Sequence, residues 1–288
     1  MEEELIEAFD NFVIGNFSTV LALCSSHQTP TSEFSKFMWD SLSARCHLAL
    51  GHVDKLRTST SQVAGYFAVF QRSQNEKDVA RKTAAFDKII AAANQSSGDP
   101  VACYYACVAR AVAGDLIDAI NYAKAVSASS PAEFIALRTQ FCLAIHRPDL
   151  ANTLLAEAAS NRDDSAASKL VSAMHALITG KTNEACMSYS DLMAQFNAET
   201  ALPLANGRAV GNIQRGLFGE AQEDIEAALS EAPQDADSLR NLICCLAWQG
   251  KRREALSTLE KLRSVATHAS HPLLQDLDRL NSAFVQFA

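Results

Sequence analysis

Gly216-Leu217-Phe218-Gly219-Glu220-Ala221 is one copy of a recurring phrase, a glycine followed five residues later by an alanine. The next copy begins at Gly250, and earlier copies begin at Gly114 and Gly180. The spacing is 36 residues from Gly180 to Gly216 and 34 residues from Gly216 to Gly250. A period near 34 residues predicts a chain built from stacked copies of one structural unit.

That unit is typical of the tetratricopeptide repeat, a pair of antiparallel helices. Glycine suits the end of the first helix, where the backbone enters the left-handed region that penalises a Cβ atom. Alanine suits the point where the two helices cross closely. Proline follows Ala119 and Ala221 at a distance of twelve residues, at Pro131 and Pro233, where it would separate one repeat from the next.

Weaker copies of the phrase begin at Gly15 and Gly51, and His146 stands at the glycine position of another copy. The sequence therefore predicts an all-α, tetratricopeptide-like helix-pair solenoid that is curved. We expect a single domain over residues 1–288 with about eight helix pairs and a C-terminal capping helix over 272–288. The region 58–100 is degenerate; there we expect helices over 61–72 and 79–93 and a loop over 96–100.

Charge and hydropathy restrict the function classes. The formal net charge is −8 and the isoelectric point is about 5.4, which argues against nucleic acid as a partner, since phosphate binding needs a basic stripe. The basic cluster Lys251-Arg252-Arg253 is interpreted as a solvated turn near a helix C-terminus. No apolar run reaches the roughly 18 residues that cross a bilayer. We expect a cytosolic protein without direct membrane insertion.

Sites for chemistry are scarce in this sequence. The eight cysteines form no CxxC pair and are interpreted as reduced thiols packed like small apolar side chains. Cys103 and Cys107 share one helix face, but no second ligand pair lies nearby. Glycine-rich phosphate loops, GxSxG elbows and HExxH motifs do not occur. We expect no catalytic residues, no cofactor and no metal.

The repeat frame instead predicts a partner-binding surface. The first helix of each pair lines the concave face, and counting back from the glycines identifies the inward positions. Peptide-binding repeats carry Lys, Arg and Asn there, whereas here the row is mostly apolar, with Asn206 and Arg240 as exceptions. The predicted groove residues are Tyr104, Val108, Leu170, Met174, Leu177, Asn206, Val210, Ile213, Arg240 and Cys244.

Two interpretations of this apolar row remain open. An exposed apolar groove would need a permanent partner, because large exposed patches mark interaction sites. Alternatively, the solenoid curls tightly and buries the same residues in its own core.

The chain as a whole resembles the coatomer ε-subunit family of the COPI vesicle coat. The resemblance runs from the first helix to the last residue and rests on several ordered motifs. They are Phe9-Asp10-Asn11-Phe12-Val13-Ile14-Gly15-Asn16-Phe17, Asp149-Leu150-Ala151 with the polar segment after it, Asn206-Gly207-Arg208-Ala209, Asn241-Leu242-Ile243, Ser270-His271-Pro272-Leu273 and Phe284-Val285-Gln286-Phe287-Ala288.

The resemblance implies a structural, non-catalytic subunit. Its direct and obligate partner would be the C-terminal region of the coatomer α subunit, with the remaining coatomer subunits as further partners. It also implies a cytoplasmic protein that lies peripherally on Golgi membranes and COPI-coated vesicles and acts in Golgi-to-ER retrograde and intra-Golgi transport. The alternative function is a cytosolic repeat cochaperone or adaptor that reads peptide motifs.

Overall fold

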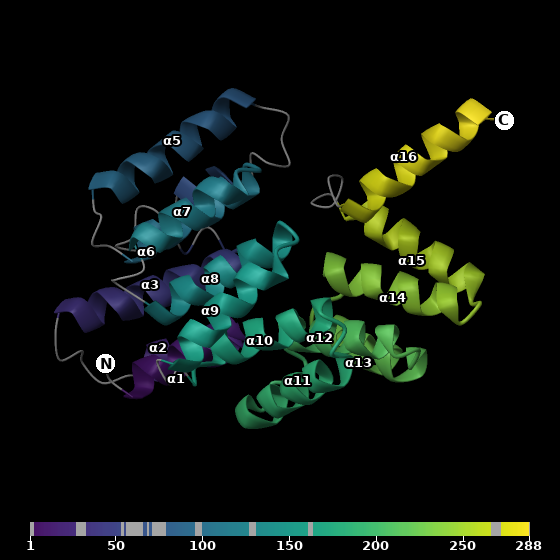
Figure 1. The fold of residues 1–288 in the computed structure, drawn as a ribbon, viewed down its shortest axis with the longest axis horizontal. Helices are drawn as coiled ribbons and strands as arrows, with labels where there is room; N and C mark the ends of the chain where they lie inside the picture. Colours follow the sequence, from purple (N-terminus) through teal and green to yellow (C-terminus); the bar gives the residue numbers. More distant parts are fainter. Residues whose placement is uncertain are drawn as a thin grey trace. The chain divides into compact units, whose positions relative to one another are not determined.

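The computed structural model describes residues 3–26, 33–52, 55, 66–67, 69–70, 79–95, 100–126, 131–160, 164–265 and 272–287. Within these ranges the chain forms α-helices and no strand, which confirms the all-α class (Figure 1). The helix predicted over 61–72 lies mostly outside the described residues. None of the helices in the described ranges is both long and apolar enough to span a membrane.

The described chain divides into two compact units, Met1–Lys181 and Thr182–Ala288. The first contains α1 (Glu3–Val13), α2 (Phe17–Ser26), α3 (Glu33–Ala49), α5 (Val79–Gln95), α6 (Pro100–Val112), α7 (Leu116–Val126), α8 (Pro131–Ala144), α9 (Pro148–Ser160) and α10 (Ala166–Ile178). The second contains α11 (Thr182–Phe196), α12 (Leu202–Gln214), α13 (Phe218–Glu231), α14 (Ala236–Trp248), α15 (Arg252–Ser264) and α16 (Pro272–Phe287). A single solenoid over the whole chain stays a prediction.

The recurring glycines end helices in the way the phrase predicts. Gly114, Gly180, Gly216 and Gly250 have φ between 75° and 94°, and their amides close the last turn of the preceding helix. His146, at the glycine position of the divergent copy, also has a positive φ of 58°. The left-handed residue is therefore set by the turn, and glycine is the residue that adopts it without strain.

The alanines of the phrase lie where neighbouring helices touch. Ala119, Ala151, Ala185 and Ala221 are fully buried, and they lie in α7, α9, α11 and α13. Successive helices contact one another, as α6, α7, α8 and α9 do in the first unit and α11 to α15 do in the second (Figure 1). The packing is that of helix pairs stacked in sequence order.

The basic cluster lies where the turn between α14 and α15 meets the start of α15. Arg252 and Arg253 are the first two residues of α15 and Lys251 precedes them, so these cations stand at a helix N-terminus. The same residues also follow the C-terminus of α14, which ends at Trp248, and the Lys251 backbone N–H donates to the Leu246 carbonyl of that helix, so the cluster lies near a helix C-terminus as expected. Cations are disfavoured at a helix N-terminus, so the cluster contributes nothing favourable to this helix end.

Candidate partner-binding site

The first helices of successive pairs enclose a cavity of about 230 Å³ in the first unit. Its walls come from α1, α3, α6, α8 and α10, together with one residue of α2. Two of the predicted groove residues, Tyr104 and Leu170, belong to this wall. The full lining is Phe12, Val13, Phe17, Arg45, Tyr104, Glu133, Ala136, Leu137, Gln140, Ala167, Leu170 and Val171.

The cavity is closed on one side because the first helix of the unit packs against the last. Helix α1 contacts both α3 and α10. The Asp10 side chain accepts a hydrogen bond from the Ala166 backbone N–H at 3.0 Å, and the Ser165 hydroxyl accepts one from the Ser168 N–H. These oxygens satisfy amides at the start of α10 that have no partner within the helix. A local cap thus joins segments 156 positions apart in the sequence.

A buried ion pair forms the polar part of the cavity wall. Arg45 is only 4% exposed, and its Nη2 lies 2.5 Å from Oε1 of Glu133. The guanidinium also lies over three aromatic rings, 4.1 Å from the centroid of Tyr104, 4.4 Å from that of Phe12 and 5.9 Å from that of Phe9. Stacking on aromatic faces and pairing with a carboxylate are the two interactions that suit a guanidinium in a dry site.

The ion pair leaves one donor free. Burial disfavours the charged form of Arg45, yet the adjacent Glu133 carboxylate more than offsets this and raises the pKa of the guanidinium. The Arg45 Nε is buried and has no hydrogen-bond partner among the described residues. A cavity with mostly apolar walls suits a side chain or backbone segment that is itself mostly apolar.

The other predicted positions of the first unit are largely packed within it. Val108 and Met174 are half-buried against neighbouring hydrophobic clusters, and Leu177 is buried. The structure therefore divides these residues: Tyr104 and Leu170 line a cavity, while the other three contact their own core.

The polar exceptions of the predicted row have partners inside the second unit. The Asn206 amide donates to the Ser238 hydroxyl at 2.9 Å and accepts from the Asn241 amide at 2.8 Å. Arg240 donates from Nη2 to Asn241 Oδ1 at 3.2 Å. The Asn206 bonds link α12 to α14, the first helices of adjacent pairs, whereas the Arg240 bond lies within α14. Asn206 and Arg240 thus form part of a hydrogen-bond network inside the second unit.

The apolar positions of the second unit are half-buried. Ile213 packs against the cluster that contains Ala209, Ala221 and Ile225, whereas Val210 is half-buried outside the identified clusters. Cys244 is also half-buried.

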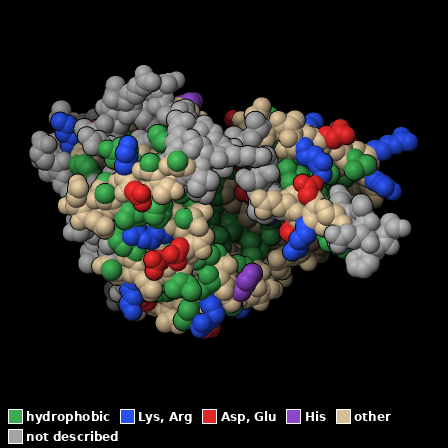
Figure 2. Space-filling view, turned by 90° about the horizontal axis from the view of Figure 1, so that it is seen from above, with side chains coloured by type: hydrophobic (Ala, Val, Ile, Leu, Met, Phe, Trp, Pro, Cys, Tyr) green, Lys and Arg blue, Asp and Glu red, His purple; other side chains and the backbone are tan. Residues whose placement is uncertain are grey.

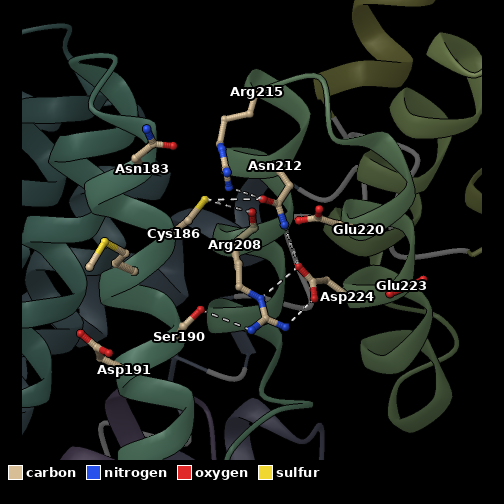
Figure 3. Close-up of a pocket in the computed structure, with 11 residues that line it drawn as sticks. Asn183, Cys186, Ser190, Asp191, Arg208, Asn212, Arg215, Glu220, Glu223 and Asp224 are labelled. Carbon is tan, nitrogen blue, oxygen red and sulfur yellow. Dashed lines mark hydrogen bonds and ion pairs between the residues drawn. The ribbon is translucent and has the colours of Figure 1, made fainter.

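A second hollow lies on the other face of α12, between α11 and α13 (Figure 3). Its volume is about 770 Å³. The Arg208 guanidinium pairs with the Asp224 carboxylate through two contacts of 2.5 and 3.1 Å, and Asn212 donates to the same carboxylate at 3.3 Å. Figure 3 shows this ion pair bridging α12 and α13 across the floor of the hollow, with the Ser190 hydroxyl within reach of Arg208.

The two faces of α12 are distinguished by helical spacing. Arg208, Asn212 and Arg215 follow one stripe, and the predicted Asn206, Val210 and Ile213 follow another stripe two residues earlier. Two residues correspond to about 200° around a helix, so the stripes lie on opposite sides. The predicted groove face and the polar hollow are therefore separate surfaces.

Sequence reasoning missed Arg45 and Glu133. A signal was available, since Arg45 interrupts a stripe of buried residues that includes Leu42 and Cys46. A charge at a core position predicts a buried partner. The sequence does not reveal which of its 33 acidic residues that partner is.

Charged side chains occur in small mixed groups. On the face drawn in Figure 2, Lys and Arg alternate with Asp and Glu among the described residues, and no continuous basic stripe crosses it. This distribution agrees with the acidic net charge.

The chain is similar to one family of proteins along its whole length. The sequence profile of the family described as coatomer epsilon subunit matches residues 1–288. A coatomer subunit epsilon-2 from Oryza sativa subsp. indica is 28% identical over 183 residues, covering 62% of this chain and 60% of the rice protein. The chain thus matches about 60% of the length of that relative. Coatomer subunit epsilon-2 of Arabidopsis thaliana is 24% identical over 294 residues, covering 98% of this chain and 93% of that protein.

Solved structures with a similar fold are helical-repeat proteins. A tetratricopeptide repeat protein from Parabacteroides merdae gives a TM-score of 0.57 at 14% identity, covering 96% of this chain and 97% of that chain. The APC/C hetero-tetramer Cut9-Hcn1 gives a TM-score of 0.64 at 12% identity, covering 94% and 54%. At these identities the similarity establishes the fold, and it confirms the predicted tetratricopeptide-like helix-pair solenoid.

Proposed function

The chain belongs to the coatomer epsilon subunit family, and from this premise we propose that it is a non-catalytic structural subunit of the COPI vesicle coat. It binds and stabilises the C-terminal region of the coatomer α subunit directly, and through that subunit it joins the remaining coatomer subunits. It acts at the cytosolic face of Golgi membranes and COPI vesicles, in Golgi-to-ER retrograde and intra-Golgi transport. The observation that carries the proposal is the family match over residues 1–288.

Physical support for a permanent partner comes from the groove residues. The cavity bounded by Phe12, Tyr104 and Leu170 is apolar apart from the Arg45–Glu133 pair and Gln140. Apolar first-helix positions such as Val210 remain half-buried. Surfaces of this kind favour the more hydrophobic class of interface found in obligate complexes.

The alternative, a cochaperone or adaptor that reads short peptides, is less favoured. A clamp for a peptide carboxylate needs Lys, Arg and Asn side chains directed at the ligand. Asn206 and Arg240 instead make hydrogen bonds to Asn241. Of the residues predicted for the groove, these are the two that a clamp could use.

Affinity purification of the tagged chain from cytosol tests the proposal. We expect the coatomer subunits to co-purify in stoichiometric amounts, with the α subunit retained through the harshest wash. Recovery of chaperones alone, or of no partner, would contradict the coat assignment and favour the adaptor.

Point variants separate groove binding from self-packing. We expect Val210→Asp to abolish co-purification of the α subunit while the far-ultraviolet circular dichroism stays unchanged. Ile213→Asp carries more risk to the fold, because Ile213 packs against a core cluster. Leu256→Asp is the matched control, since Leu256 is exposed on α15. Loss of helicity in Val210→Asp would favour the interpretation that the groove residues belong to the core.

A further inference from the structure

Trp248 is the most exposed of the large hydrophobic side chains among the described residues, at 72%. It ends α14, and its ring stacks in parallel on Phe218 at the start of α13, with a centroid distance of 5.9 Å and an interplanar angle of 1°. One side of the indole is therefore supported by Phe218. An exposed Trp is unusual, because burying an aromatic ring removes a large apolar area from water.

The surroundings of Trp248 are held by specific hydrogen bonds. The Gln249 amide donates to the Phe218 carbonyl and to Gln222 Oε1, both at 3.0 Å. Lys251 Nζ donates to the same Gln222 oxygen at 3.3 Å, and the Lys251 backbone N–H closes the turn onto Leu246. These hydrogen bonds hold the ring stack and the start of α15 in a fixed arrangement without a partner. Fewer side chains need to be ordered on binding, which lowers the entropic cost of binding.

Three cations follow Trp248 closely in the sequence, at residues 251–253. Lys251, Arg252 and Arg253 are exposed, and among the described residues none of the three has an ion-pair partner. They outnumber the one acid next to them, Glu254. They stand between the C-terminus of α14 and the N-terminus of α15.

We propose that Phe218, Trp248, Lys251, Arg252 and Arg253 form a docking surface, the Trp248 patch, for an acidic protein segment that carries an aromatic or long aliphatic side chain. The apolar side chain would pack on the open face of the indole. The carboxylates would pair with the three cations, two of which are guanidiniums suited to bidentate contacts. Trp and Arg are the side chains enriched at interface hot spots.

Charge complementarity favours a protein segment over a lipid surface. Anionic membranes are typically recognised by clusters of about four to eight Lys and Arg residues, whereas this patch has three. The chain as a whole carries a charge of −8, which an anionic bilayer would repel. A short acidic segment contacts only the patch and avoids that repulsion.

The Trp248 patch extends beyond the function proposed above and is tested separately. Its residues lie at the ends of α13, α14 and α15, and none of them is a predicted groove residue or lines the cavity of the first unit. Failure of one proposal therefore leaves the other standing.

The test uses the full chain and a synthetic peptide rich in Asp and Glu around one Phe and one Leu. The sequence has two tryptophans, and Trp39 is buried, so acrylamide quenching reports mainly on Trp248. We expect the peptide to reduce quenching in a saturable way, and high salt to weaken this effect. The anisotropy of a labelled peptide should give the same affinity.

Substitutions in the Trp248 patch test which of its side chains contact the peptide. Trp248→Ala, and separately Lys251→Glu with Arg253→Glu, should each weaken peptide anisotropy binding by about tenfold or more. Met187→Ala and Lys261→Glu are the matched controls, because both residues are exposed in the same unit away from the patch, and they should bind normally. Circular dichroism verifies that every variant is folded.

Three results would overturn the proposal. The first is equal binding of a peptide in which each acid is replaced by Lys. The second is protection of Trp248 by vesicles containing phosphatidylserine but not by the acidic peptide, which would assign the patch to a lipid surface. The third is self-association in sedimentation velocity that Trp248→Ala abolishes, with no peptide binding, which would assign it to a second copy of the chain.

Discussion

Gly207 is the position where a single methyl group matters most. A Cβ atom built on Gly207 would lie 2.3 Å from Cζ of Tyr189, a buried side chain on the neighbouring helix α11. We expect Gly207→Ala to lower the free energy of unfolding by about 1–3 kcal/mol, because overpacking outweighs the better helix propensity of Ala. Urea unfolding followed by circular dichroism measures this change.

Gly219 provides the matched control. It lies in α13, and a Cβ atom there would meet nothing within 4 Å. We expect Gly219→Ala to leave stability unchanged or to raise it by up to about 1 kcal/mol, because Ala restricts the unfolded chain and favours helix. Equal losses in both variants would mean that contact with Tyr189 is not the reason Gly207 is small.

The two kinds of glycine differ in how far the sequence predicts them. Gly216 and Gly250 were identified from the repeat, because a left-handed turn is a local requirement that recurs at a fixed spacing. Gly207 lies inside a helix, and the sequence does not predict its packing against Tyr189, because that contact depends on the position of the neighbouring helix. Local backbone geometry follows from the sequence pattern, whereas close approach between helices does not.

At the scale of elements, the Arg45–Glu133 pair joins α3 to α8. The two residues are 88 positions apart, and both are buried. We expect Glu133→Gln to destabilise the fold by about 3–5 kcal/mol, because it leaves a buried guanidinium without a counter-charge. The double variant Arg45→Met with Glu133→Leu should recover most of this loss. Urea midpoints of the single and double variants provide the comparison.

An exposed ion pair tests whether burial is the reason that loss of the Glu133 charge destabilises the fold. Arg147 and Asp149 form a bidentate ion pair on the surface, with contacts of 2.8 and 2.6 Å. We expect Asp149→Asn to leave the urea midpoint unchanged, since exposed pairs contribute little. The double variant Arg45→Met with Glu133→Leu could instead have a urea midpoint as low as that of Glu133→Gln. That result would indicate that the shape of the pair, rather than its charge, holds α3 to α8.

At the scale of the whole molecule, the sequence predicted the repeat class, whereas a single solenoid over the whole chain stays a prediction. The period near 34 residues identified helix pairs, because each pair repeats the same local turn and crossing. The boundary between the two compact units, at Lys181 and Thr182, falls inside the Gly180 phrase, and no feature of that phrase predicts it. The groove positions were predicted from the same repeat frame. Their exposure depends on packing between helices far apart in the sequence, as the contact of α1 with α10 illustrates.

Buried thiols in the first unit make the stability of the fold depend on alkaline pH. Burial raises the pKa of Cys46 and Cys107 from 9.0 to about 12. In the unfolded chain these thiols ionise near their ordinary pKa, so above pH 9 the unfolded state holds fewer protons than the folded state. The stability from this difference is fully present below pH 9 and is lost as the pH rises towards 12.

We expect the free energy of unfolding to fall by about 1.5 kcal/mol per thiol between pH 8 and pH 10. Burial also raises the pKa of Tyr105 and Tyr189, and these phenols begin to add to the loss as the pH approaches 10, so the thiols dominate the decline at the lower end of this range. Urea unfolding at closely spaced pH values measures the slope. In Cys46→Ala with Cys107→Ala the stability at pH 8 should be lower, because two buried groups are truncated, while the decline towards pH 10 should become shallower. A decline of the same steepness in that double variant would show that other groups titrate in this range, and that the two thiols are not the source of the alkaline sensitivity.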